Sequence, residues 1–68
     1  MKPMHQAIKT AIEEYVEKHG YSPSVEEIGA AVGLKSKATV SRHVKNMIAI
    51  GILETDHPGA ARALRVAK

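Results

Sequence analysis

The chain has 68 residues, enough for one small domain that buries only about 60% of the surface its unfolded chain exposes. It contains no Phe, Trp or Cys, so its core must be aliphatic, and disulfides and thiolate metal sites are excluded. Ten basic and seven acidic residues give a net charge of +3, and no apolar run approaches the roughly 18 residues of a membrane span. We therefore expect a single domain over residues 1–68, soluble and cytoplasmic.

The charge is unevenly distributed along the chain. Residues 1–34 carry three lysines and five glutamates, a net charge of −2, whereas residues 35–68 carry seven basic and two acidic side chains, a net charge of +5. A one-sided basic surface is typical of proteins that bind polyanions. A basic domain whose charge only keeps it soluble is the alternative, and the charge alone does not decide between the two.

The first predicted helix runs from about Pro3 to His19. Proline suits a first helical turn, where its missing N–H costs nothing, and Gly20 is placed to end the helix in a left-handed conformation. Helical spacing puts six side chains on one side of it: Met4, Ile8, Ala11, Ile12, Tyr15 and His19.

A second helix is predicted from Val25 to a stop at Gly33. Ser24-Val-Glu-Glu27 has the pattern of a capping box, in which the serine accepts from a backbone N–H and the glutamate reaches back. Its predicted buried stripe is Val25, Ile28 and Val32. Three small residues allow a neighbouring helix to approach closely: Gly29, Ala30 and Ala31.

The third predicted helix begins after the cap Ser36, at about Lys37, and ends at Ile48 or Ala49. At 100° per residue, one face is apolar and consists of Val40, Val44, Met47 and Ile48. The opposite face is polar and basic and consists of Ala38, Ser41, Arg42, Lys45 and Asn46. A short helix, a glycine turn and a helix with a groove-sized polar face are typical of a helix-turn-helix.

From Ile52 the pattern changes from helical to alternating. Residues 52–55 and 62–66 are predicted strands, joined by a turn over Asp56-His-Pro-Gly59. The predicted fold is therefore mainly α: a winged helix-turn-helix with three helices and a two-stranded antiparallel β-hairpin as the wing.

The stretch from Gly20 to Ser36, followed by Thr39-Val40, His43-Val44 and Gly51-Ile-Leu53, resembles the amino-terminal DNA-binding domain of LexA-type repressors. The resemblance implies a transcriptional repressor whose third helix, residues 37–49, enters the major groove of a palindromic operator. The family's base-contacting positions fall, by motif, on Ser36, Ala38, Thr39, Ser41 and Arg42.

This sequence also departs from the family. Ala38 cannot hydrogen-bond a base edge, and Lys37, Ser41 and Arg42 differ from the usual types, so the family's operator sequence is not carried over. LexA-type repressors continue into a domain that dimerises and cleaves the chain with a Ser-Lys pair. This chain ends two residues after Val66 and has no Ala-Gly dipeptide. We therefore expect no self-cleavage. The chain is expected to be either a stand-alone regulator of phage, plasmid or mobile-element origin or a domain cut from a longer protein. No enzymatic activity is expected, because the sequence shows no converging nucleophile, base and orienting group.

The side chains expected at DNA divide into two groups. Arg42 is the best candidate to read a base, because arginine bonds guanine O6 and N7 together, although a phosphate contact is an equal alternative. The other expected base contacts are Ala38, Thr39 and Ser41. Phosphate contacts are expected from Ser24, Lys35, Ser36, Lys37, Lys45 and Arg62. For Thr39 a local bond back to the Ser36 cap is a serious alternative, and His43 is expected to be packed.

No cofactor or metal is expected, because the four histidines are scattered and no phosphate-cradling glycine loop is present: Gly20, Gly33, Gly51 and Gly59 are each accounted for by a turn. The expected partners are double-stranded DNA and a second copy of the chain, paired through the wing, the first helix or the DNA itself. The rival interpretation is a protein-interaction module that binds another regulator. The basic face from Lys35 to Asn46, which carries no acidic residue, argues against it.

Overall fold

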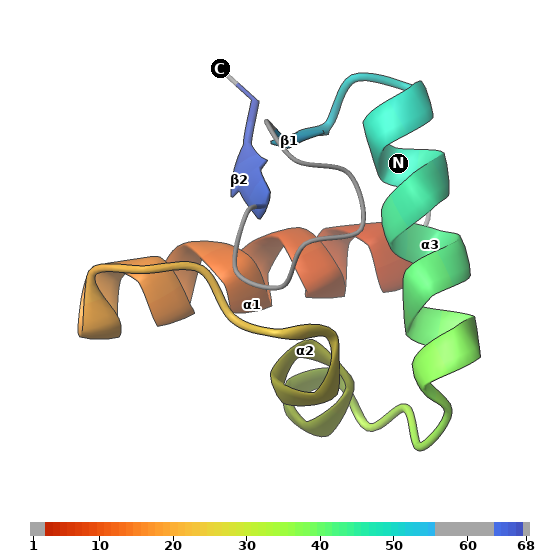
Figure 1. The fold of residues 1–68 in the computed structure, drawn as a ribbon, viewed down its shortest axis with the longest axis horizontal. Helices are drawn as coiled ribbons and strands as arrows, with labels where there is room; N and C mark the ends of the chain where they lie inside the picture. The colour runs from red at the N-terminus through yellow and green to blue at the C-terminus, as the bar shows by residue number, and fades with distance from the viewer. Residues whose placement is uncertain (1–2, 56–63, 68) are drawn as a thin grey trace.

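The computed structural model describes residues 3–55 and 64–67. Its elements are α1 (Pro3–His19), α2 (Val25–Val32), α3 (Lys37–Ala49), β1 (Leu53–Thr55) and β2 (Leu64–Val66). In Figure 1, α1 lies across the middle, α2 lies below it, the hairpin lies above it, and α3 runs past its amino end. The predicted bounds of all three helices and the winged helix-turn-helix fold are confirmed.

Within the described residues, the hairpin pairs three residues on each strand, and residues 62 and 63 of the predicted second strand lie outside them. β1 and β2 pair antiparallel, with Leu53 opposite Val66 and Thr55 opposite Leu64. Ile52 was predicted to begin the first strand but lies just before β1. Its N–H donates to the Met47 carbonyl at 2.9 Å across the turn after α3, and its carbonyl accepts from the Ala67 N–H at 2.9 Å, next to the hairpin pairs. The predicted turn over residues 56–59 lies outside the described residues.

The start of α2 is fixed by the predicted capping box. The Ser24 side chain accepts from the Glu27 N–H at 3.2 Å, and Glu27 Oε1 accepts from the Ser24 N–H at 2.8 Å. The other carboxylate oxygen of Glu27 accepts from the Tyr15 hydroxyl at 2.5 Å. Glu27 therefore joins the start of α2 to α1, a contact that the sequence pattern does not reveal.

One core holds the elements together. Its buried side chains come from every helix and from β1: Ile8, Ile12, Ile28, Val40, Val44, Met47 and Leu53. Partly buried residues pack around them: Met4, Val25, Val32, Leu34, Ile48, Ile52, Leu64 and Val66. The predicted apolar stripes are thus confirmed at their centres.

The two ends of α1 differ from the predicted pattern. His5 is only 4% exposed, although the predicted buried side does not include it. It lies at the end of α1 that α3 covers, and its ring meets the His43 ring edge-on at 5.5 Å. His19 shares a side with Ile8 and Ile12 by spacing, yet it is exposed at the far end of α1.

The backbones of α2 and of the turn before α3 meet at Gly29. A Cβ at this position would lie 2.8 Å from the Leu34 carbonyl oxygen and 3.2 Å from a methyl of Val40. The Leu34 N–H also donates to the Gly29 carbonyl at 2.9 Å, across the left-handed Gly33. Close approach was predicted for the three small residues 29–31, but Ala30 and Ala31 are exposed, so only Gly29 makes this contact.

Gly29→Ala is therefore expected to destabilise the domain, although alanine is the better helix former. The added methyl group meets backbone that cannot move without shifting α3, and overpacking of this kind costs about 1–3 kcal/mol. Thermal unfolding followed by circular dichroism measures the loss. Ala30→Ser, which adds one atom at an exposed neighbour, is the control. Equal midpoints for the two variants would contradict the close approach.

Candidate nucleic-acid interface

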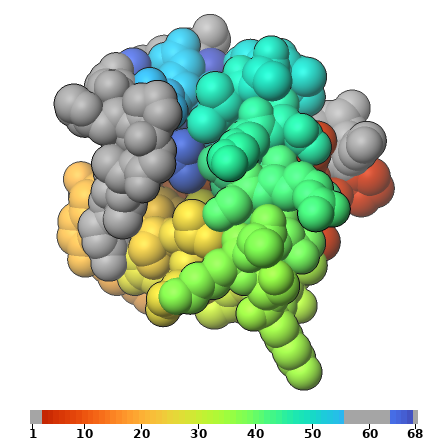
Figure 2. All heavy atoms as spheres, turned by 45° about the vertical axis from the view of Figure 1, so that its right-hand side comes forward, coloured from red at the N-terminus to blue at the C-terminus, as the bar shows by residue number. Residues whose placement is uncertain are grey.

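The two faces of α3 are separated as the sequence predicts. Val40, Val44 and Met47 are buried against the core. The exposed positions of α3 include Ala38, Arg42, Lys45 and Asn46, whereas Thr39 and Ser41 are half-buried. The helix carries no acidic side chain, so its outward face is positively charged. Figure 2 shows α3, in green, on the surface of the molecule, with side chains near its start projecting from the body.

Ser36 caps the amino end of α3. Its side chain accepts from the Thr39 N–H at 3.4 Å, and its backbone is extended. The local hydrogen bond between Thr39 and the Ser36 cap, expected as an alternative to a DNA contact, is therefore made by the backbone N–H of Thr39. Ser36 is exposed and stands between the exposed Lys35 and Lys37, so the turn into α3 presents two ammonium groups beside the amino end of the helix.

Lys37 forms an ion pair with a residue of α2 that is distant from it in sequence. Its Nζ lies 2.5 Å from Oε1 of Glu26, and both side chains are about two-thirds exposed, at 69% and 67%. Glu26 comes from the first turn of α2. The basic surface is therefore not free of acidic groups, because α2 contributes one at its edge.

Ser24 lies in a less favourable place for a phosphate than its helix-start position indicates. It is half-buried, and the α2 capping box uses both its N–H and its hydroxyl oxygen. Two glutamates stand in the first turn of that helix. Their negative charge opposes the attraction of the helix amino end for anions.

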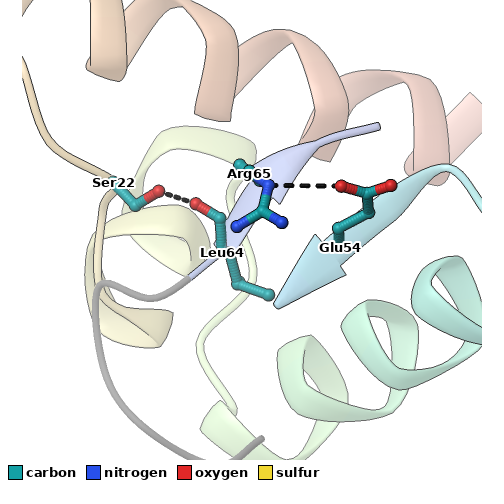
Figure 3. Close-up of polar contacts among 4 residues, drawn as sticks. All are labelled: Ser22, Glu54, Leu64 and Arg65. Atoms are coloured by element: carbon teal, nitrogen blue, oxygen red, sulfur yellow. Dashed lines mark hydrogen bonds and ion pairs between the residues drawn. The ribbon is translucent and has the colours of Figure 1, made fainter. Parts of the chain in front are cut away.

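Figure 3 shows a polar contact that ties the wing to the helical body and an ion pair that crosses the hairpin. The Ser22 hydroxyl, in the link between α1 and α2, donates to the Leu64 carbonyl of β2. Across the hairpin, Arg65 Nε donates to Glu54 Oε2 at 3.2 Å. Arg62, the predicted phosphate contact of the wing, lies outside the described residues.

Neither a metal site nor a membrane span is found among residues 3–55 and 64–67. No three His, Asp or Glu side chains there lie close enough together to bind a metal ion. Within the same residues, no helix has both the length and the apolar character to cross a membrane.

The similarity of this sequence to known proteins agrees with this geometry. The family model of the LexA DNA binding domain matches residues 3–63. The chain belongs to this family. The LexA repressor of Limosilactobacillus reuteri is 43% identical over 65 residues, which are 96% of this chain and 31% of that protein. The LexA repressor of a Nocardioides species is 41% identical over 66 residues, which are 97% of this chain and 26% of that protein.

A third relative extends the range of bacteria. The LexA repressor of Koribacter versatilis is 44% identical over 52 residues, which are 76% of this chain and 24% of that protein. The chain thus spans a third or less of the length of these relatives. The matched family is a DNA-binding domain, and the matched residues include the helix-turn-helix that α2 and α3 form.

The wing contacts predict a difference between two variants. Ser22 is buried, so Ser22→Ala leaves the Leu64 carbonyl without its donor and should cost about 1–3 kcal/mol. Glu54→Gln weakens an exposed ion pair and should cost less than about 1 kcal/mol. Chemical denaturation measures both free energies of unfolding. A larger loss for Glu54→Gln would contradict the assigned anchor.

Proposed function

We propose that residues 1–68 form a single DNA-binding domain that recognises specific double-stranded sequences and acts as a transcriptional repressor. The observation that carries the proposal is the exposed, basic face of α3, which is fixed to the body by Val40, Val44 and Met47 on its other side. An α-helix fits the major groove of B-form DNA, and a helix held rigidly by its scaffold can present side chains to base edges. The name of the relatives, LexA repressor, supports repression rather than activation.

In this proposal α3 lies in the major groove. Arg42 reads a base, with guanine as the preferred partner because it offers two acceptors to one guanidinium. The positions beside it at the bases are Ala38, Thr39 and Ser41. Contacts to phosphates come from Lys35, Ser36, Lys37 and Lys45, with Arg62 of the wing and, less favourably, Ser24.

We further propose that two copies bind one palindromic operator. A single domain of this size makes a small interface, and a helix-turn-helix dimer places its two reading helices on half-sites one helical turn or more apart. The number of protein chains per duplex can be measured by sedimentation of the protein bound to an operator that has been enriched from a random DNA pool. Two chains per duplex at saturation are expected, and one chain per duplex would refute the pairing.

Binding to duplex DNA should weaken steeply as salt rises. Each neutralised phosphate releases counterions, so about three to five phosphate contacts per chain give a slope of about −2.7 to −4.5 in a plot of the logarithm of affinity against the logarithm of salt concentration. Fluorescence anisotropy with a labelled random duplex at 50–200 mM salt measures the slope. The absence of duplex binding even at the lowest salt would instead favour the protein-interaction module.

Arg42→Ala and Lys45→Gln should separate reading from positioning. Loss of a bidentate base contact weakens operator binding by about 1–3 kcal/mol more than it weakens binding to random DNA. Loss of a phosphate contact weakens both alike and makes the salt slope shallower by about 0.9. Titrations of both variants against both duplexes test this. An equal loss on the two duplexes for Arg42→Ala would assign Arg42 to a phosphate.

A further inference from the structure

We propose that Glu26 attenuates the DNA affinity of this domain by competing with a phosphate for Lys37. This inference rests on the proposed function, since it concerns the same surface. It assigns to an acidic residue of α2 a part in setting the strength of binding.

The position of the pair supports this role. Lys37 is the first residue of α3 and stands beside the cap Ser36, where the helix amino end and two lysines would draw a phosphate. Glu26 reaches this point from α2, and its Oε1 lies 2.5 Å from Lys37 Nζ. Both side chains help to line a depression between α2 and α3, together with Gly29, Leu34 and Val40.

Glu26 differs from the glutamate next to it in what it contacts. Glu27 is half-buried, and its carboxylate accepts hydrogen bonds from the Ser24 N–H and from the Tyr15 hydroxyl. Glu26 is exposed and turns toward α3. Glu27 thus holds α1 and α2 together, whereas the Glu26 carboxylate lies at the edge of the proposed DNA surface.

The electrostatic consequence has a definite sign. In the free domain the carboxylate compensates the charge of Lys37. When DNA binds, Lys37 must leave Glu26 to meet a phosphate. The Glu26 carboxylate then remains within about one Debye length, about 8–10 Å, of the DNA phosphates, so its charge is only partly screened from them. Both effects weaken binding, and they weaken operator and random duplex alike because phosphates carry no sequence information. Each half-site is thereby held more weakly, so stable occupancy depends more on the pairing of two domains.

The experiment compares Glu26→Gln with Glu17→Gln, which changes the net charge by the same amount. Glu17 is exposed near the carboxyl end of α1, the end that points away from α3 in Figure 1. Anisotropy titrations of both variants use the enriched operator and a random duplex at 50–200 mM salt. Glu26→Gln should tighten binding about two- to fivefold on both duplexes at 50 mM salt, the range expected for one exposed ion pair, and should steepen the salt slope. Glu17→Gln should change affinity much less.

A second background tests the competition itself. In Lys37→Gln the carboxylate has no lysine to hold, so adding Glu26→Gln should give at most half the gain, measured as the logarithm of affinity, that it gives with Lys37 present. Thermal unfolding of every variant checks folding, and the salt slope is a readout that a purely structural role for Glu26 would not change.

The outcomes separate this inference from the proposed function. If the unmodified domain binds duplex DNA with a steep salt slope but Glu26→Gln behaves like Glu17→Gln, or binds more weakly, only the attenuation is overturned. An equal gain with and without Lys37 would also overturn it, because Glu26 would then act by simple repulsion. If the unmodified domain binds no duplex at low salt, both proposals fail.

Discussion

The direction of α3 depends on the close packing between α2, the turn after it and α3. α2 has eight residues, and a helix shorter than about 12 residues is marginal in water, so tertiary contacts must hold it. Ile28 supplies the buried side chain, and Gly29 lets the Leu34 carbonyl and Val40 come within contact of its backbone. The Leu34 N–H bonds the Gly29 carbonyl across the turn. α3 is therefore fixed by backbone and core together, which is the rigidity that a reading helix needs.

The same packing determines the electrostatics of the surface. It brings the amino ends of α2 and α3 close enough for Glu26 to meet Lys37. Consecutive helical residues are separated by about 100° of rotation, so Glu27 faces Tyr15 of α1 while Glu26 faces α3. Glu27 thereby makes a hydrogen bond that holds the fold, whereas Glu26 places a negative charge at the edge of the proposed DNA surface. The sequence divides into an acidic first half and a basic second half, but in the folded domain the two halves meet at this point.

Local patterns in the sequence predicted most of the fold. Caps at Ser24 and Ser36 and the apolar spacing of α3 depend on neighbours within one or two turns, and these predictions are confirmed. What they missed depends on contacts between elements distant in sequence. To predict the burial of His5, one must know that α3 crosses that end of α1. To predict the Glu26–Lys37 pair, one must know the angle between α2 and α3. The predicted base and phosphate contacts remain predictions, because they depend on a DNA partner.

The proposed contacts also limit how much specificity one domain can supply. Ala38 offers only a methyl group, and Thr39 and Ser41 are short and half-buried, so Arg42 is the one long side chain among the proposed readers. A good bidentate contact discriminates by about 1–3 kcal/mol, whereas specific and non-specific binding typically differ by about 4–10 kcal/mol. Two domains on a palindrome double the first figure to about 2–6 kcal/mol, which reaches the lower part of that range. In this proposal the remainder is divided between the short side chains of Thr39 and Ser41 and the sequence-dependent shape and deformability of the DNA, which discriminate at positions that no side chain touches.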